Sequence, residues 1–354
     1  MTNHETFKLS ICIPTYNRWA YLRPLLTKLL NCISPNVQIV VGDGFSNDET
    51  QSQLMEISRT NLNVKYIRFE SKGGIDVDLM KTISAADGTY CWLMSSDDSF
   101  NDKAVQIIIA AIEERPALLL LNRTICDAKL RQIRQDNWLA EGAQNSFHLS
   151  DKKDCLAYLG RAKSVGALFG YMSVLVINKK HWLAALSYER TKIRYYSHAH
   201  DIFAMLQTPG NRLDIIEEPL ILCRFYNDSF SEEGFLSRTM IDFDGFMNIQ
   251  SKFFPQKAFQ EAIYRILRLE HPWYRLLRAR SESTKDAWDT DIRRKLELCG
   301  YPKRELNVIS LLGRWTCLVV LLTSIKKAGK WLKVLWLLSM KYASSALNSP
   351  RTGG

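Results

Sequence analysis

The first part of the chain alternates between short apolar runs and longer amphipathic stretches. The apolar runs are bounded by turn residues and are too short for helices, so they predict buried strands at residues 9–14, 37–41, 64–69, 90–94 and 117–121. The stretches between them predict helices at residues 21–32, 49–59, 75–86 and 102–115. Strands that alternate with helices in this way predict an α/β fold with a parallel sheet and right-handed crossovers.

The pattern is less regular after residue 122. Residues 164–177 are expected to form a loop and a strand that face the edge of the sheet where the parallel strands end. Residues 190–206 are expected to form a polar cluster that runs into a helix, and residues 213–225 a closing pair of strands. From about residue 229 the chain is expected to be helical, with aromatic and basic residues through residue 280.

Polar clusters of the first hundred residues follow the predicted strands, at the edge where function collects in parallel sheets. Pro14-Thr-Tyr-Asn-Arg18 follows the first strand, where free backbone N–H groups can meet an anion or a polar base. Asp43 follows the second strand and can accept hydrogen bonds from a base or a ribose. The simpler interpretations are a capped helix start and an ordinary turn.

Ser95-Ser-Asp-Asp98 follows the strongly apolar fourth strand. Adjacent carboxylates are what Mg²⁺ or Mn²⁺ needs, because both ions prefer oxygen ligands. Such an ion neutralises charge on a departing nucleoside diphosphate. The alternative is that Asp97 or Asp98 caps a helix that begins near Asp102.

Taken together and in order, these clusters resemble the family 2 glycosyltransferases. The segments that carry the resemblance are Ile13-Pro-Thr-Tyr-Asn-Arg18, Asp43 through Thr50, Gly73-Gly-Ile-Asp76 and Cys91-Trp-Leu-Met-Ser-Ser-Asp-Asp98. The variants Gly-Gly-Ile-Asp-x-Asp-Leu and Tyr-Cys-Trp-Leu-Met-x-Ser-Asp-Asp look most like the abequosyltransferase-type branch, whose members add dideoxy sugars to O-antigen repeats. The resemblance covers roughly residues 8–230.

This resemblance implies the GT-A fold of nucleotide-diphospho-sugar transferases, with a mostly parallel central sheet and a C-terminal helical region. It implies a hexosyltransferase that uses a CDP-, UDP- or dTDP-sugar donor and a divalent cation, Mn²⁺ or Mg²⁺. Asp97 and Asp98 would stand at the metal and the diphosphate. Ser95 replaces the first acid of the Asp-x-Asp-Asp that many relatives carry, so the metal would be held more weakly. The residues implied to bind the nucleotide sugar are Pro14, Thr15, Tyr16, Asn17, Arg18, Asp43, Gly74, Asp76 and Asp97.

A further cluster, His198-Ala-His-Asp201, lies in the second half of this region. Inverting enzymes of this fold use a carboxylate to take the proton of the acceptor hydroxyl. Asp201 is the predicted base, with His200 beside it as a second catalytic candidate. The alternatives are that Asp201 caps a helix at residues 202–206, or only positions the acceptor in a retaining enzyme.

The composition favours a cytoplasmic protein. The eight cysteines are scattered without any CxxC pair, which argues against a disulfide framework or a zinc site and fits a reducing compartment. The first eight residues are polar and lead straight into a strand, so they do not form a signal peptide.

The net charge of +10 is concentrated in residues 306–354, which hold seven basic residues and no acid. These basic residues alternate with Trp and Leu, a pattern that favours an anionic membrane surface over nucleic acid. The alternatives are a helical part packed on the core, a dimer contact, or a true span, for which the apolar run 315–325 is too short. The expected domains are catalytic at 1–228, helical at 229–305 and membrane-associating at 306–354.

These features predict a peripheral enzyme on the inner face of the bacterial cytoplasmic membrane, acting on a lipid-linked oligosaccharide in O-antigen synthesis. A nucleotidyltransferase is an alternative, but it should carry a glycine-rich basic loop after the first strand, which Pro14–Arg18 is not. A non-catalytic nucleotide-binding relative is the other alternative, for which Ser95 is the one hint.

Overall fold

The computed structural model describes residues 7–187, 194–225 and 234–313. The chain divides into two compact units, one of Met1–Glu232 with Ile241–Glu270 and one of Glu233–Met240 with His271–Gly354. The division falls within α8 (Gly234–Phe253). In the described residues the first unit is built on a sheet and the second is helical.

The strands of the first unit form one sheet in the order β3-β2-β1-β4-β9-β6-β10-β5. Neighbouring strands pair in parallel from β3 through β4 and again between β6 and β10, while β9 is antiparallel to both β4 and β6. β6 therefore runs in the same direction as β4, and the carboxyl ends of β1, β2, β3, β4, β6 and β10 point to one edge. The bounds are β1 Leu9–Thr15, β2 Val37–Asp43, β3 Val64–Arg68, β4 Tyr90–Leu93, β5 Ser99–Phe100, β6 Leu118–Cys126, β9 Leu175–Asn178 and β10 Leu213–Arg224.

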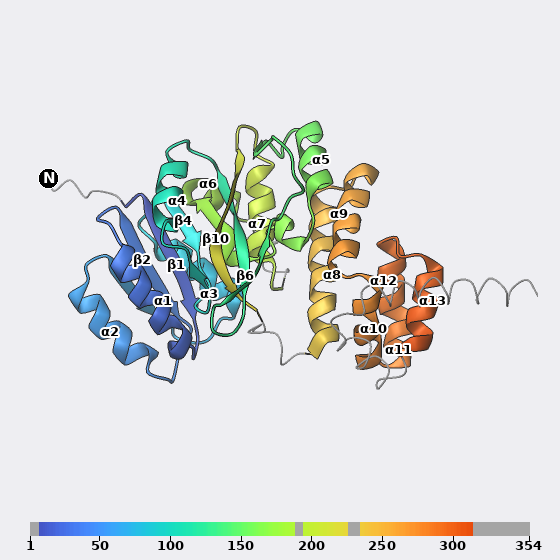
Figure 1. Cartoon of the computed structure of the whole chain (residues 1–354), viewed down its shortest axis with the longest axis horizontal. Helices are drawn as coiled ribbons and strands as arrows, with labels where there is room; N and C mark the ends of the chain where they lie inside the picture. Colours follow the sequence, from blue (N-terminus) through green and yellow to red (C-terminus); the bar gives the residue numbers. More distant parts are fainter. Residues whose placement is uncertain (1–6, 188–193, 226–233, 314–354) are drawn as a thin grey trace, which may run out of the picture. The chain divides into compact units, whose positions relative to one another are not determined.

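Helices cover this sheet, so β1 and β2 are buried along their whole length (Figure 1). The helices in this part are α1 (Trp19–Cys32), α2 (Thr50–Thr60), α3 (Ile75–Ala85) and α4 (Ala104–Ile112). α3 packs on β1 and β2, and α2 packs on β3. The leucines of α1 that face the sheet are buried, at about 1.5–3 kcal/mol for each fully buried side chain; they are Leu22, Leu25, Leu26 and Leu29.

The predicted strands and helices of the first 121 residues are confirmed to within a few residues. The predicted pair of strands at 213–225 is wrong, because β10 is one strand that pairs with β6 along most of its length. The pairing register shifts on either side of Pro219, where the backbone lacks an N–H donor. The proline at this irregularity resembles a turn residue in the sequence, so one strand was mistaken for two.

The remaining helices of the first unit are α5 (Lys152–Arg161), α6 (Lys179–Ala185), α7 (Ser197–Leu206) and α9 (Lys257–Glu270). α5 packs on α9, and Arg265 of α9 donates hydrogen bonds from Nη2 to the carbonyls of Leu159, Gly160 and Ala162 (2.7, 3.1 and 2.9 Å). These carbonyls lie at the end of α5, where no further turn supplies donors. Arg265 thus caps one helix from another.

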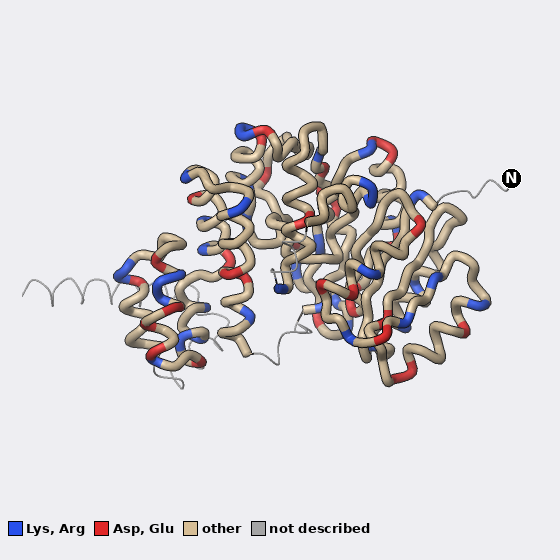
Figure 2. Tube along the Cα trace, turned by 180° about the vertical axis from the view of Figure 1, so that it is seen from behind, with Lys and Arg blue, Asp and Glu red and all other residues tan. Residues whose placement is uncertain are grey.

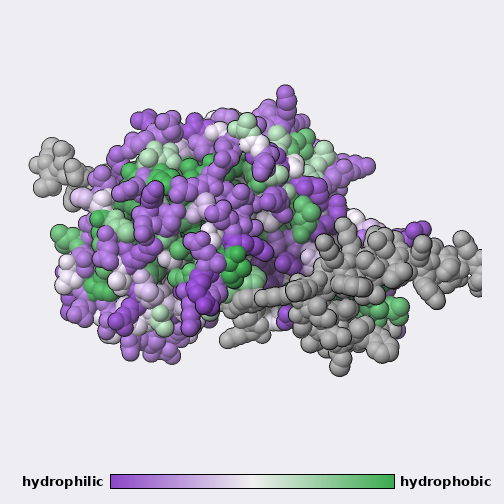
Figure 3. Space-filling model, viewed as in Figure 1, coloured by the Kyte–Doolittle hydropathy of each residue, from purple (hydrophilic) through white to green (hydrophobic). Residues whose placement is uncertain are grey.

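Between α5 and β9 the chain forms two short helical turns, Val165–Leu168 and Met172–Val174. β7 (Gln132–Asp136) pairs with β6, and β8 (Ser146–Phe147) pairs with β10. The sequence had predicted none of α5, β7 and β8. The described surface seen in Figure 3 is mostly hydrophilic, with small scattered apolar areas.

The second unit is a set of helices around a small apolar core. Trp288, in a π-helical segment at Trp288–Ile292, is fully buried and donates a hydrogen bond to Ser310 Oγ (2.7 Å). Its helices are α10 (Trp273–Glu282), α11 (Lys285–Ala287), α12 (Arg293–Leu298) and α13 (Lys303–Leu312). The predicted helical character of residues 229–280 is confirmed where the structure describes them.

The helices of the second unit carry both signs of charge (Figure 2). The basic bias noted in the sequence lies farther on, and its residues 314–354 are outside those that the structure describes. Among the described helices of the chain, none combines the length and apolar character needed to cross a membrane. The three-part domain division stays a prediction.

Candidate active site

The last residues of β1, β2 and β3 lie side by side across the sheet. Thr15 is in register with Asp43, and Asp43 with Arg68. The first two residues were predicted to bind the nucleotide, and the third was not singled out. The sheet therefore brings the first two predicted clusters together at its carboxyl edge.

Asp43 is fully buried and held by protein donors. Its Oδ1 accepts a hydrogen bond from the Ser46 backbone N (2.8 Å), and its Oδ2 accepts one from the Tyr66 hydroxyl (2.9 Å). Burial, together with this hydrogen bond to Asp43, raises the pKa of Tyr66 to about 12, so the tyrosine keeps its proton and donates. Arg68 Nη1 lies 3.7 Å from the same oxygen. The predicted contact of Asp43 with a base stays a prediction, and it requires Tyr66 or Arg68 to move aside.

The loops after β1 and β2 are joined by hydrogen bonds. The Asn17 backbone N donates to Ser46 Oγ (2.9 Å), and the Asn47 backbone N donates to Asn17 Oδ1 (2.8 Å). Asn17 has φ 51°, a left-handed conformation that asparagine tolerates better than most residues. The predicted Pro14–Arg18 and Gly42–Asp48 clusters therefore form a single network.

Asp48 accepts hydrogen bonds from the first residues of both helices that follow these two loops. Its carboxylate accepts hydrogen bonds from the backbone N of Trp19, at the start of α1, and of Thr50, at the start of α2 (both 3.0 Å). Partial burial works against the charge, but the hydrogen bonds from Thr50 and Trp19 hold the pKa of Asp48 below its ordinary value. The carboxylate therefore stays ionised at the amino ends of two helices, where a negative charge is favourable.

Among the buried polar atoms at this edge, Thr15 Oγ1 and Arg68 Nη1 have no hydrogen-bond partner in the described structure, although Arg68 Nη1 keeps its 3.7 Å ion pair with Asp43. Buried polar groups normally find partners, so such atoms at a strand end call for a ligand or water to complete them. Aromatic side chains lie beside them. The Arg68 guanidinium stacks on the half-exposed ring of Phe45 (4.3 Å to the centroid), and Lys72 Nζ lies over Tyr16 (4.3 Å).

Asp98 is almost completely buried after β4. Its Oδ2 accepts hydrogen bonds from the Tyr171 hydroxyl and from Ser173 Oγ (2.6 Å), and its Oδ1 accepts one from the Arg224 backbone N (3.1 Å). Burial, and then the charge of Asp97, raise the pKa of Asp98 to about 6, although these hydrogen bonds oppose the shift. At neutral pH the carboxylate is ionised and fixed in orientation.

Asp97 faces a cation from another cluster. Arg18 Nη1 lies 2.6 Å from Asp97 Oδ2, and the Ser95 hydroxyl donates to Oδ1. Arg224 Nε donates to the backbone carbonyl of Asp97 (2.9 Å). Ser95, the departure from the family pattern, is thus a partner of the acid pair.

The alternative helix-cap role of the acid pair is wrong. The residue that precedes α4 is Lys103, and no side chain caps that helix. Asp97 and Asp98 instead point to partners from β10, from the segment before β9 and from the loop after β1.

The acid pair fits a divalent cation whose coordination a nucleotide completes. In the described part of the chain no group of three or more His, Cys, Asp or Glu side chains gathers around one point. Mg²⁺ in nucleotide sites is commonly held by one or two carboxylates plus substrate phosphates, so Asp97 and Asp98 suffice. The guanidinium on Asp97 shows that this carboxylate already attracts a cation.

Asp76 and Gly74 lie at the start of α3. Gly74 has φ 81°, which glycine adopts without strain. Asp76 Oδ2 accepts a hydrogen bond from the Tyr195 backbone N (2.6 Å), and Oδ1 accepts from Ser197 N and Oγ (3.2 and 2.7 Å). Asp76 therefore holds the beginning of α7 beside α3, and its predicted contact with the nucleotide stays a prediction.

Asp201 and His200 lie inside α7, not at its start. The alternative that Asp201 caps a helix is therefore wrong. Asp201 is fully buried, with Oδ1 3.4 Å from His200 Nδ1, and His198 Nε2 lies 3.1 Å from the Phe169 carbonyl oxygen. An acceptor hydroxyl cannot reach Asp201 in this arrangement, so its role as the base stays a prediction that requires local opening.

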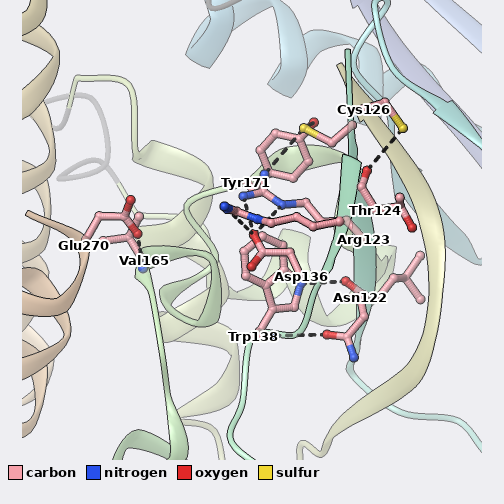
Figure 4. Close-up of polar contacts among 12 residues, drawn as sticks. Asn122, Arg123, Thr124, Cys126, Asp136, Trp138, Val165, Tyr171 and Glu270 are labelled. Atoms are coloured by element: carbon pink, nitrogen blue, oxygen red, sulfur yellow. Dashed lines mark hydrogen bonds and ion pairs between the residues drawn. The ribbon is translucent and has the colours of Figure 1, made fainter. Parts of the chain in front are cut away.

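The sequence analysis did not single out the residues that surround Tyr171, a hydrogen-bond partner of Asp98. The guanidinium of Arg123 on β6 packs against the rings of Trp138 and Tyr171, whose centroids lie 4.4 and 4.5 Å away (Figure 4). Asp136 pairs with it at 3.1 Å. The expectation that residues 164–177 face the site pointed to this region but not to its residues.

Comparisons with known proteins bear on the family and the fold of this chain. The model of the glycosyl transferase family 2 matches residues 10–170. The chain is 29% identical over 331 residues to the abequosyltransferase RfbV of Salmonella typhimurium, spanning 91% of this chain and 98% of that protein.

Solved structures resemble the whole fold. TarS 1–349 of S. aureus in complex with UDP-GlcNAc superposes with a TM-score of 0.59 at 16% identity, covering 87% of this chain and 89% of that one. A mannosyltransferase from Pyrobaculum calidifontis in complex with GDP-Man and Mn²⁺ superposes with a TM-score of 0.50 at 11% identity, covering 90% and 88%. The predicted GT-A fold is confirmed.

Proposed function

We propose that this chain, a glycosyltransferase with a family 2 domain at residues 10–170, transfers a sugar from a nucleotide-sugar donor to a lipid-linked oligosaccharide in O-antigen synthesis. A dideoxyhexose such as abequose is the proposed sugar. The similarity to an abequosyltransferase over nearly the full length of both proteins supports this choice. Solved structures of this fold in complex with UDP-GlcNAc and with GDP-Man support a nucleoside-diphosphate donor.

The observation that carries the proposal is the gathering of the predicted clusters at one sheet edge. Thr15, Asp43 and Arg68 lie in register at the ends of three neighbouring strands. The ion pair between Arg18 and Asp97 (2.6 Å) connects this row to the acid pair after β4. A nucleoside at the row would place its diphosphate toward Arg18 and the acids.

The unpartnered atoms support a nucleotide at this position. Thr15 Oγ1 and Arg68 Nη1 are buried polar groups that hydroxyl or carbonyl oxygens of a nucleoside would satisfy. Phe45 and Tyr16 offer rings beside them. Arg18 would exchange Asp97 for phosphate oxygens, to which arginine binds strongly.

Asp97 and Asp98 would hold a divalent cation, Mn²⁺ or Mg²⁺. Such a cation, when bound, stabilises the negative charge that develops on the leaving nucleoside diphosphate. Asp98 is already oriented by three donors, and Asp97 is the acid that a phosphate-bound cation would meet after Arg18 shifts.

The acceptor is proposed to approach from the side of His198–Asp201, with Asp201 or His200 taking its proton. Asp76 supports this side, because it holds the start of α7 next to α3. Residues 314–354, which are rich in basic residues, Trp and Leu, would bind the membrane that holds the lipid-linked acceptor. The proposed location of the enzyme is accordingly the inner face of the cytoplasmic membrane.

The test is binding and hydrolysis of UDP-, CDP-, GDP- and dTDP-sugars by the purified protein, with and without Mn²⁺. We expect one nucleotide class to bind and its affinity to rise with Mn²⁺. Binding of none of the four would contradict the donor site and favour a non-catalytic relative. Arg18→Met should weaken binding of the preferred nucleotide, whereas Arg23→Met, in the helix α1 that follows, serves as a matched control and should not.

A further inference from the structure

Asp98 is held by a chain of polar groups that continues beyond its immediate partners. The Tyr171 hydroxyl contacts both Asp98 Oδ2 and Cys223 Sγ, the latter at 2.9 Å. Arg123 Nη1 in turn lies 3.6 Å from the same sulfur. Four side chains from β6, β10, the loop after β4 and the segment before β9 are thus connected in series.

The protons of this chain can be placed by counting donors. A tyrosine hydroxyl has one proton, and a carboxylate oxygen is a far better acceptor than a thiol sulfur. Tyr171 therefore donates to Asp98 and accepts from the S–H of Cys223. Because the guanidinium of Arg123 has only N–H donors, it donates to the sulfur.

Burial keeps the thiol in the form that this order needs. Cys223 is buried, and burial followed by the charge of Asp98 raises the pKa of its thiol to about 12. The thiol therefore carries its proton at any physiological pH. All hydrogen bonds of the series then point from the arginine toward the carboxylate, and such bonds polarise one another.

Arg123 is fixed at the far end of the chain. Its guanidinium packs against the adjacent rings of Trp138 and Tyr171, and Asp136 accepts hydrogen bonds from its Nε and Nη2 at 3.4 and 3.1 Å (Figure 4). Arg123 and Asp136 are direct partners across the antiparallel β6–β7 pair. A rigid cation thus begins the series, and a buried carboxylate ends it.

We propose that the series Arg123–Cys223–Tyr171 positions the carboxylate of Asp98 for the divalent cation of the donor complex. This inference rests on the proposed function, since it assigns the cation to Asp97 and Asp98. Arg123, Cys223 and Tyr171 are positioning residues, because they act through Asp98. Partners that orient a metal ligand typically change metal affinity 10–100-fold when they are removed.

The decisive comparison is Cys223→Ala against Cys223→Ser. Serine keeps one donor and one acceptor at this point, while alanine breaks the series with a similar loss of volume. Tyr171→Phe removes the last donor with little change in shape. The measurement is Mn²⁺ affinity by electron paramagnetic resonance, on the full chain, with whichever of CDP, UDP, GDP and dTDP the unmodified protein binds most tightly.

We expect Cys223→Ala and Tyr171→Phe to bind Mn²⁺ about tenfold more weakly or worse. Cys223→Ser should remain within about threefold of the unmodified protein, since it restores the series. Binding of the nucleotide without metal should be the same in all variants. Far-ultraviolet circular dichroism and thermal unfolding establish that each variant is folded.

The outcomes separate the inference from the function on which it rests. Equal Mn²⁺ affinity in the unmodified protein, Cys223→Ala and Tyr171→Phe would overturn the positioning series and leave the proposed function standing. Equal losses in Cys223→Ala and Cys223→Ser would assign the effect to packing and also overturn it. A lack of metal-dependent nucleotide binding in the unmodified protein would overturn the proposed function itself.

Discussion

At the scale of single residues, Asp78 is a buried acid whose charge is poorly compensated. It lies in α3, and its Oδ1 accepts a hydrogen bond from the Gly73 backbone N (3.1 Å). Burial raises the pKa of Asp78, and the charges of Lys81 and Lys72 offset this only in part. The folded protein therefore holds the Asp78 proton more tightly than the unfolded chain does.

From this shift we predict that Asp78→Asn raises the melting temperature at pH 7. Ionisation of Asp78 lowers stability as the pH rises from the ordinary aspartate pKa, about 4, through the raised pKa of the folded state. Asparagine keeps an acceptor for Gly73 and never ionises. Thermal unfolding of both proteins between pH 4 and 8 should show a gap that widens with pH. A gap independent of pH would contradict the argument.

Asp98→Ala is expected to abolish turnover while the protein stays folded. The carboxylate is a predicted metal ligand at a strand end, and its loss removes several kcal/mol of charge stabilisation, or about a thousandfold in rate. The control is Asp102→Ala, an exposed acid of the same segment that pairs with Lys28 (2.8 Å). Initial rates with the preferred donor measure both. Activity of Asp98→Ala equal to that of the control would remove Asp98 from the site.

Residues that follow a strand could be predicted as site residues, whereas their partners could not. Asp97 and Asp98 stand directly after an apolar run, so their place at the sheet edge follows from the pattern. Tyr171 and Cys223 are distant from Asp98 in the sequence, and no local periodicity connects them with it. Arg18 and Asp97 were both predicted, but their ion pair depends on how α1 and β4 sit on the sheet.

At the scale of helices and strands, regular periodicity decided what could be predicted. In the first 121 residues strands and helices alternate regularly, and each predicted element appears where expected; only the two-residue strand β5 was not predicted. Residues 122–163 hold β7, β8 and α5, which are short or lie in a strongly polar segment. α7 begins at Ser197 because Asp76, from α3, supplies acceptors for its first backbone N–H groups. Because Asp76 is distant from α7 in the sequence, the residues around Ser197 carry no sign of this cap.

Arg265 offers a test of packing between helices. Arg265→Met keeps much of the apolar stem but removes the donor to the last carbonyls of α5. We expect a loss of about 1–3 kcal/mol in the free energy of unfolding, as for hydrogen bonds to a charged group. Urea denaturation measures it, with Arg268→Met, one turn along α9, as the control. Metal-dependent nucleotide binding should not change.

At the scale of the whole molecule, the sequence pattern predicts the α/β sheet and a helical region after it. The boundaries between domains were not predictable, because α8 contributes to both compact units and contains no linker composition. The chain belongs to the GT-A fold in spite of a reversed strand, β9, that alternation of strands and helices would not reveal.

Membrane binding is expected to reside in residues 314–354. A protein that ends at Gly313 keeps α13, whose Leu306 and Ile309 are buried in the second unit, so it should stay folded. It should no longer sediment with vesicles of anionic phospholipid. The full chain with Lys326, Lys327, Lys330 and Lys333 changed to Gln should bind about a thousandfold more weakly, at about 1 kcal/mol per lysine.

The control for the membrane experiment is vesicles of zwitterionic lipid, to which all forms should bind weakly. Added salt should release the full chain, because the attraction is screened within about 10 Å at 0.1 M. If the shortened protein stays on anionic vesicles, the attachment lies elsewhere in the chain.

The reversal of β9 has a consequence for how this enzyme can diversify. β9 begins beside the end of β4. The segment between β6 and β9 therefore leaves the sheet at the carboxyl edge of the parallel strands and re-enters it at the same edge. Evolution can lengthen or shorten the loops of this segment, which carries the short strands β7 and β8, without changing the order of the strands from β1 to β9. The donor machinery on β1 to β4 would be inherited nearly unchanged, while this segment adapts to new acceptors. Chimeras that exchange residues 127–170 between relatives but keep Asp136 and Trp138, the partners of Arg123, are therefore a rational route to altered acceptor choice.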